Sequence, residues 1–408
     1  MSTFSGFVSE IPGISVDRFL ERNRRQSTVF LLSHCHSDHM VGLDFRENLP
    51  GPLYASPIST VFLKHRFPQL SGNIRSLEIG EPTVISLKTE NNTRQLQVTA
   101  IPAGHCPGSV MFLFENENQQ QVLYTGDFRI SAKDLRNIKA LRSLSLNSIY
   151  LDTTFFNPNY NYFPAQADSL ARLVTLCSEW LSLDDRNVIS IKLPALIGSE
   201  FLFMELSRQL KQKVHVQQKE WQQYRYLACL DESITPDSSA ARIHACLGTS
   251  FRQDVGKLPC KPELDCNRHV RVIRPSALRW QKLAVGDPYW KRLRKDREEY
   301  AVCYSNHASY EELEDFLRYL RPKRVIFCVL PKHDPDGERM NLLLGNILGV
   351  EERTVVGEDM NENVLLSFKG IVYRQPDRSS KQMLSDDDSG EEDTVIHHLP
   401  KRYRKELS

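Results

Sequence analysis

The feature that most constrains this chain is a cluster of four metal-ligand side chains directly after a buried-strand pattern. Apolar residues 28–32 predict a short strand, and His34, His36, Asp38 and His39 follow it. Side chains alternate along an extended backbone, so the first two histidines project to the same side, and the turn that follows brings Asp38 and His39 to a neighbouring point. Imidazole and carboxylate groups are suitable zinc ligands. A solvent-exposed polar loop, the alternative, accounts poorly for so dense a cluster.

Two further loops offer ligands of the same kind. The segment Pro102–Ser109 carries His105 between glycine and proline residues, and Tyr124–Arg129 ends a strand at a glycine and then presents Asp127. A carboxylate at such a position can bridge two metal ions about 3.5–4 Å apart. Alone, each residue is typical of an ordinary loop or turn. Beside the first cluster, we predict that both are ligands.

Composition places the chain among globular proteins. It has 408 residues, 40% of them hydrophobic and 25% charged, with 52 Lys and Arg against 51 Asp and Glu. This near-neutral charge excludes a uniformly basic coat but not a local basic patch. Nine cysteines without a closely spaced framework, and no secretory signal, favour a reducing intracellular compartment. No apolar run approaches the roughly 18 residues that span a bilayer, so we expect no membrane partner.

Beyond residue 155 the pattern changes from strands alone to an alternation of helices and strands. Strand patterns at 110–114, 121–125 and 149–151 come first, followed by helical spacing at 165–183 and 200–211 around a strand at 188–191. Ser309 and Glu312 form a capping box for a helix through Leu320, before a last strand at 324–330. The alternation predicts an α/β layered fold. From residue 374, an acidic run and the basic cluster 401–405 predict a disordered charged tail.

A second group of zinc-type side chains lies further along the chain. His244 and Cys246 stand two residues apart, which points both side chains the same way on an extended segment. With His215 and Cys260 they make a His₂Cys₂ set, a tetrahedral shell typical of structural zinc. From spacing alone, free buried cysteines are an equally good interpretation, and Cys266 and His269 are alternative ligands.

In this order, the motifs resemble the metallo-β-lactamase superfamily and, more narrowly, the DNA-repair nucleases of its β-CASP group. Ile14–Phe19, Leu151–Phe155 and Ser305–Tyr310 extend the resemblance over about residues 10–330. It implies an α/β fold, a four-layer αββα metallo-β-lactamase core with an inserted α/β β-CASP domain. We place the core at 1–156 and 304–373, the insertion at 157–303 and the tail at 374–408. A His, a His-x-Cys and a later Cys hold zinc in the insertion of such relatives, which favours Cys260 here.

The resemblance implies a role for each candidate residue. The first metal ion would take the ligands His34, His36, His105 and Asp127; the second would take Asp38 and His39, with Asp127 as the bridge. Asp17 and Asp152 would support the site, because carboxylates orient ligating imidazoles. Without the resemblance, Asp17 is better interpreted as a surface turn residue. His307 would assist the leaving group beside a phosphate contact from Ser305. We therefore expect one or two zinc (or magnesium or manganese) ions in the catalytic site and one structural zinc in the insertion. The predicted catalytic residues are Asp38, His307, Asp17 and Asp152.

Two departures from the wider group bear on the substrate. RNA-processing members carry a late histidine on a strand end, where this chain has Cys328 and Val329, which favours DNA and a weaker second metal site. Members that degrade from a 5′ phosphate tend to carry Gly-Lys-Glu before a helix, where this chain has Gly198-Ser199-Glu200. The missing lysine favours endonucleolytic cutting slightly, since Lys192 can compensate.

Residues 257–299 carry a local excess of basic side chains that predicts DNA phosphate contacts. The candidates are Arg274, Lys291, Arg292 and Arg294, although Glu298 and Glu299 can neutralise the run and leave an ordinary solvated face. The predicted function is a metal-dependent DNA nuclease in nuclear DNA repair, an endonuclease with 5′ exonuclease activity. We expect a monomer that contacts repair proteins through its tail. Three alternatives remain: an RNA-processing endonuclease; a small-molecule hydrolase, which would lack the large insertion; and a silent scaffold, which would have lost ligands.

Overall fold

The computed structural model describes residues 2–349 apart from 46–47, 89–92, 194–198, 247–257, 259, 262 and 265. The charged tail predicted from residue 374 lies outside this part of the chain, and so do Gly198 and the side chain of Cys266. None of the helices in the described part is both long and apolar enough to cross a bilayer.

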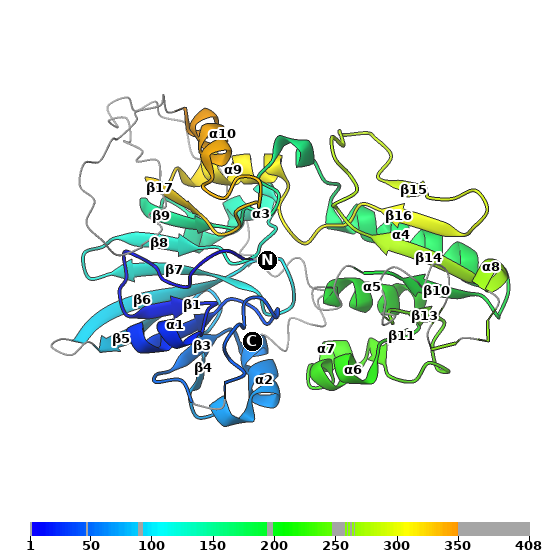
Figure 1. Ribbon diagram of the computed structural model, residues 1–408, viewed down its shortest axis with the longest axis horizontal. Helices are drawn as coiled ribbons and strands as arrows, with labels where there is room; N and C mark the ends of the chain where they lie inside the picture. The colour runs from blue at the N-terminus through cyan, green and yellow to red at the C-terminus, as the bar shows by residue number, and fades with distance from the viewer. Residues whose placement is uncertain are drawn as a thin grey trace, which may run out of the picture.

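Two sheets stack face to face in one half of the molecule (Figure 1). The first sheet is entirely parallel, with the order β1 (Ile14–Val16), β2 (Val29–Leu32), β3 (Leu53–Ala55) and β4 (Ile74–Ser76). The second is mixed and has six strands in the order β17-β9-β8-β7-β6-β5. Their bounds are β5 Pro82–Lys88, β6 Thr93–Pro102, β7 Val110–Asn116, β8 Gln121–Tyr124, β9 Leu146–Leu151 and β17 Arg324–Phe327.

Side chains that alternate between the two faces of each strand pack the two sheets and their helices into four layers. Along β7, Phe112 points to the core between the sheets, where it meets Leu31 of the first sheet, whereas Met111 points to the opposite face. That outer face packs against the helices, as Leu317 shows. The helices on the outer face of the second sheet are α3 (Ala132–Asn137), α9 (Tyr310–Leu320) and α10 (Glu338–Leu348). Helix α2 (Pro57–Arg66) packs on the outer face of the first sheet, and α1 (Glu21–Gln26) follows β1 in the chain. The predicted αββα core is confirmed.

The other half is a seven-stranded sheet with its own helices (Figure 1). Its order is β12-β11-β13-β10-β14-β16-β15, parallel except for β15 at one edge. The strands are β10 (Val188–Ile191), β11 (Val214–His215), β12 (Ile234–Thr235), β13 (Ile243–His244), β14 (Val270–Pro275), β15 (Trp290–Arg292) and β16 (Glu299–Val302). The helices are α4 (Gln166–Leu181), α5 (Glu200–Leu210), α6 (Gln218–Tyr224), α7 (Ala228–Asp231) and α8 (Cys266–His269). Short 3₁₀ turns lie at Pro68–Leu70, Lys139–Leu141 and Pro158–Tyr160.

The two halves share a hydrophobic core rather than meeting through a loose linker. The cluster on the outer face of the first sheet includes Phe62 of α2 and continues to Phe203 of α5 and Tyr224 of α6. The rings of Phe62 and Tyr224 lie 6.5 Å apart. The domain boundaries at 156/157 and 303/304 stay a prediction, and every strand of the seven-stranded sheet falls between them.

Local patterns placed the elements that they predicted to within a few residues. The strand at 188–191 and the helix opened by Ser309 match β10 and α9, and the capping box is formed. The last strand is shorter than the predicted 324–330 and ends at Phe327. The reason is that the N–H and the carbonyl of Val329 bond to the Thr153 hydroxyl instead of a strand partner.

Candidate metal centre

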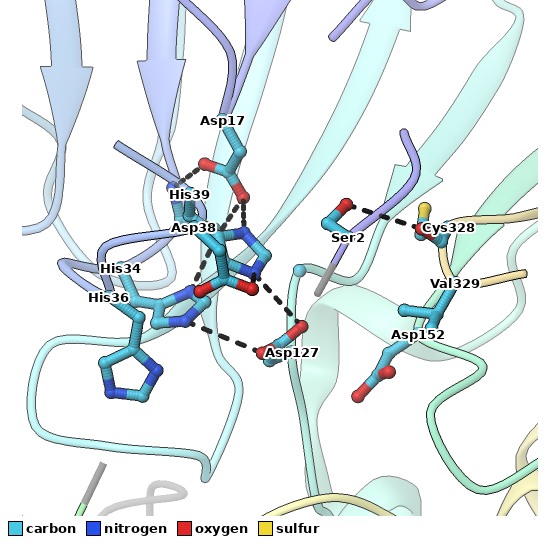
Figure 2. Close-up of polar contacts among 12 residues, drawn as sticks. Ser2, Asp17, His34, His36, Asp38, His39, Asp127, Asp152, Cys328 and Val329 are labelled. Atoms are coloured by element: carbon cyan, nitrogen blue, oxygen red, sulfur yellow. Dashed lines mark hydrogen bonds and ion pairs between the residues drawn. The ribbon is translucent and has the colours of Figure 1, made fainter. Parts of the chain in front are cut away.

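The candidate ligands come together at one edge of the two core sheets (Figure 2). The cluster beginning at His34 follows β2, His105 follows β6, Asp127 follows β8 and Asp152 follows β9. Strands β6, β8 and β9 run in the same direction, so their carboxyl ends meet at one edge. Gly126 permits the turn that presents Asp127: its φ is +52°, and an added Cβ would lie 2.7 Å from the Ser33 hydroxyl.

Four of the predicted ligands form a compact set. One ligand atom from each of His34, His36, His105 and Asp127 lies within 4.8 Å of all the others. Nε2 of His105 is 3.6 Å and Nε2 of His34 is 3.8 Å from Asp127 Oδ2, and His105 Nε2 lies 3.0 Å from His36 Nδ1. Among the described residues, Nε2 of His34 is buried without a hydrogen bond. A buried ring nitrogen that makes no hydrogen bond destabilises the folded chain unless it binds a cation, and here it faces a carboxylate. The donor set therefore fits a divalent metal ion.

The second predicted set is more open. Nε2 of His39 lies 3.3 Å from Asp127 Oδ1 and 3.9 Å from Asp38 Oδ2, and it too is buried without a hydrogen bond in the described part of the chain. The Asp38 side chain is 34% exposed at the rim. Cys328 joins none of the potential metal-binding groups found among the described residues. A second, weaker metal site stays a prediction.

Asp17 supports the site from beneath and is buried, so the alternative of a surface turn is wrong. Its carboxylate accepts hydrogen bonds from the Ser33 N–H at 2.7 Å, the Ser33 hydroxyl at 2.5 Å and the Tyr124 hydroxyl at 2.8 Å. It also accepts one from His39 Nδ1 at 2.8 Å. This bond places a proton of His39 on Nδ1 and turns Nε2 toward the cluster.

His307 faces the cluster from the loop before α9. Its Nδ1 donates to Asp152 Oδ2 at 2.8 Å, and its Nε2 lies 3.9 Å from Asp127 Oδ2. Burial would lower the pKa of His307, but Asp152 and Asp127 together raise it to about 9. Ser305 is buried, and its hydroxyl donates to the His307 carbonyl and accepts from the His307 N–H. Ser305 thus shapes this turn, and its phosphate contact stays a prediction.

Among the predicted ligands, the electrostatics favour neutral imidazoles beside an ionised carboxylate except at His39, whose pKa Asp127 and Asp17 raise despite its burial. Burial, followed by neighbouring histidines, lowers the pKa values of His34 and His36, and burial and His307 lower the pKa of His105 to about 4. Burial opposes ionisation of Asp127, but His39 and His307 hold its pKa well below the usual range. Metal ligands must be deprotonated, so at neutral pH the compact set is in the state that a cation requires.

The predicted zinc ligands of the insertion also converge. His215 and His244 are register partners on β11 and β13, with their Nδ1 atoms 3.2 Å apart. Cys246 Sγ lies 2.8 Å from His215 Nδ1 and 3.3 Å from Cys260 Sγ, which is 3.3 Å from His244 Nδ1. A hydrogen bond from Cys246 and others from the two histidines lower the pKa of Cys260 to about 3. His269 instead contacts Asn187. The zinc itself stays a prediction.

The predicted DNA contacts are mostly paired with acidic side chains. Arg274 lies 2.7 Å and Arg294 3.7 Å from Glu299, and Arg292 lies 2.8 Å from Glu298. Lys291 instead lies over the buried Trp280 ring, 5.1 Å from its centroid. The neutralisation that the sequence left open therefore occurs, and a role in DNA binding stays a prediction for all four residues.

Three further side chains near the site were not predicted to support it. Ser33 and Tyr124 hold Asp17. Ser33 directly precedes His34 and Tyr124 lies three residues before Asp127, and this proximity was the available signal. Glu200 is buried and accepts from the Tyr224 hydroxyl at 2.6 Å. It lies within 4.8 Å of ligand atoms of His36 and Cys106. No local pattern indicates that contact, because Glu200 begins a helix of the other half.

Comparison with known proteins agrees with this geometry. A model of the DNA repair metallo-beta-lactamase domain matches residues 228–333, and a model of the beta-lactamase superfamily domain matches residues 15–173. The 5′ exonuclease Apollo of Mus musculus is 30% identical over 405 residues, which cover 94% of this chain and 68% of the relative. This chain belongs to the DNA-repair metallo-β-lactamase family.

The motifs in the sequence resemble Artemis in particular, and the identities support that resemblance. Protein artemis of Gallus gallus is 36% identical over 367 residues, which cover 84% of this chain and 50% of the relative. Protein artemis of Homo sapiens is 36% identical over 356 residues, which cover 81% of this chain and 50% of the relative. The chain thus spans about half the length of the artemis relatives that it matches.

Proposed function

We propose that this chain is a metal-dependent nuclease that hydrolyses phosphodiester bonds of DNA in repair. The observation that carries the proposal is the compact set of His34, His36, His105 and Asp127, with the protonated His307 facing it. Similarity to Protein artemis and to the 5′ exonuclease Apollo supports a nucleic-acid substrate. Retention of every predicted ligand argues against a silent scaffold.

The proposed cofactors are one or two zinc, magnesium or manganese ions. His34, His36, His105 and Asp127 would hold the first, and Asp38, His39 and Asp127 the second. When bound, such ions activate water for attack and offset the charge of the phosphate. One further zinc, held by His215, His244, Cys246 and Cys260, would stabilise the insertion.

The side chains around the ions divide the remaining work. Asp17 holds a proton on Nδ1 of His39 and so directs Nε2 toward the metal site. Asp152 orients His307 and keeps it protonated at neutral pH, because the pKa of His307 is raised to about 9. His307 can therefore donate a proton to the departing 3′ oxygen as a general acid. Each of these bonds is formed within the protein before substrate binds, which limits the reorganisation needed during the reaction.

DNA is the proposed substrate, cut endonucleolytically at hairpins and overhangs. The late strand end carries Cys328 where RNA-processing members carry a histidine, and Cys328 belongs to none of the potential metal-binding groups among the described residues. A 5′ exonuclease activity is the second candidate, favoured by the similarity to Apollo over 94% of this chain. DNA contacts from Ser305, Arg274, Lys291, Arg292 and Arg294 belong to the proposal. So do a nuclear location, a monomeric state and contacts of the tail with repair proteins.

A cleavage assay on the purified chain tests the proposal. Hairpin, overhang, 5′-phosphorylated single-stranded DNA and RNA substrates are compared, with metal analysis of the same sample. We expect cleavage of DNA, and its loss in His36→Ala and Asp38→Ala, while Asp44→Ala, an exposed carboxylate in the same region, keeps activity. Cleavage of RNA alone, or of no nucleic acid, would overturn the function. Full activity in Asp38→Ala would overturn the site.

A further inference from the structure

We propose that Arg129 is a positioning residue that holds His307 against the metal centre and ties that placement to the segment entering the insertion. The inference rests on the proposed function, because His307 is the proposed proton donor. It concerns a side chain two positions after Asp127 that is 7% exposed. A guanidinium group this deeply buried needs partners for its donors, and the identity of these partners indicates its role.

The guanidinium group of Arg129 joins the stretch from Ser305 to Glu312 to the segment before α4. Its Nε lies 3.1 Å from the Glu312 carboxylate in the first turn of α9. One terminal nitrogen donates to the Ser305 carbonyl at 3.0 Å, and the other to the Pro164 carbonyl at 2.9 Å. Pro164 lies just before α4, the first helix of the insertion half. The planar fork of arginine serves these directions at once, which a lysine ammonium group on a single stem does not.

The contact with Ser305 is one of several that fix the loop of His307. Gln166, also from the insertion half, donates to the same Ser305 carbonyl at 3.1 Å. The next carbonyl, of Asn306, accepts from His105 Nδ1 at 2.9 Å. The imidazole of His307 is then held by Asp152. Arg129 therefore anchors the start of the loop, and a candidate metal ligand anchors its middle.

The backbone of Arg129 is fixed to the same centre. Its N–H donates to the Ala103 carbonyl at 2.9 Å, in the loop that carries His105. A Cβ added to Gly104 would lie 2.4 Å from the Arg129 carbonyl oxygen, so the two loops are in close contact. A change at the guanidinium group thus releases the Ser305 end of the loop and leaves the ligand loops held by backbone contacts.

The test is a kinetic cycle with Arg129→Lys, His307→Ala and the double variant on a DNA substrate that the wild-type chain cleaves. We expect Arg129→Lys to lower kcat by roughly 10–100-fold, since misplacement by about 1 Å costs that much, with KM and bound metal little changed. In the His307→Ala background the same change should cost less than about twofold, because residues that act as a unit are not additive. Arg271→Lys is the matched control, because Arg271 is also buried and pairs with Glu298, outside the centre. It should lower the melting temperature but leave kcat unchanged.

Wild-type kcat in Arg129→Lys, or a full multiplicative loss in the double variant, overturns the inference. If Arg129→Lys does not fold, Glu312→Gln decides, since it keeps an acceptor for the helix cap but weakens the hold on the guanidinium group. Wild-type kcat there overturns the inference as well. Crystal structures of the wild-type chain and of Arg129→Lys show the position of His307 without relying on activity. If the wild-type chain proves inactive, only the proposed function is refuted, and the structures still test the inference. Loss of the 2.8 Å bond between His307 and Asp152 in the variant supports the inference, and its retention overturns it.

Discussion

Replacing Asp17 by asparagine tests whether one buried carboxylate holds the metal centre together. Asparagine has the same shape and tolerates the left-handed backbone of this position, where φ is +54°. The substitution therefore removes the charge without adding backbone strain. Oδ2 accepts three hydrogen bonds, from Ser33, His39 and Tyr124, and Oδ1 accepts one from the Ser33 N–H.

The magnitude follows from these four bonds. If the amide oxygen takes the place of Oδ2, its three bonds each weaken by about 0.5–1 kcal/mol as the acceptor becomes neutral. The amide nitrogen then faces the N–H of Ser33 and leaves this buried donor unsatisfied, at about 1–3 kcal/mol. We expect a loss of about 2.5–6 kcal/mol in the free energy of unfolding. Because the tautomer of His39 is no longer fixed, metal affinity should fall by about 10–100-fold.

Urea denaturation followed by circular dichroism gives the free energy of unfolding, and competition with a chelator gives the metal affinity. Asp184→Asn is the control, because that carboxylate forms an ion pair with Arg186 at the surface, where such pairs contribute little to stability. If Asp17→Asn changed stability by no more than this control and left metal affinity intact, the carboxylate would not have the role assigned to it.

The other predictions concern pH, zinc and salt. The protonated His307 is lost as pH rises through its raised pKa of about 9, so kcat should fall there. Asp152→Asn should move this decline to lower pH, and an unmoved profile would contradict the proton-donor role. Cys260→Ser should remove the zinc of the insertion, lower the melting temperature and spare the catalytic metal, as measured by elemental analysis; an unchanged zinc content would exclude the site. Lys291→Ala should reduce the salt dependence of DNA binding by about one unit of slope. Arg292→Ala should reduce it less, because Arg292 is already paired with Glu298, and equal slopes in all three proteins would dismiss this surface.

The sequence could indicate the metal centre because its chemistry is concentrated in short segments. The four ligand-type residues from His34 to His39 follow β2 directly, and the glycine turn before Asp127 needs no distant contact to be recognised. Apolar runs and the capping box at Ser309 likewise depend on neighbours within a few residues, which is why β10 and α9 were located correctly. Family resemblance, rather than spacing, assigned the roles of Asp17, Asp152 and His307.

Tertiary structure decided which of these groups meet. Asp17 and His39 are 22 positions apart, and Arg129 and Glu312 are 183 apart, so only the packing of the sheets and helices creates either pair. Strand register likewise places His215 beside His244, and the pairing of β14, β15 and β16 brings Glu298 and Glu299 to the arginines that the sequence offered to DNA. The local sequence determines which side chains can bind a metal ion or transfer a proton, and on which element they lie. The contacts that set their protonation and orientation act through space, and they exist only in the folded chain.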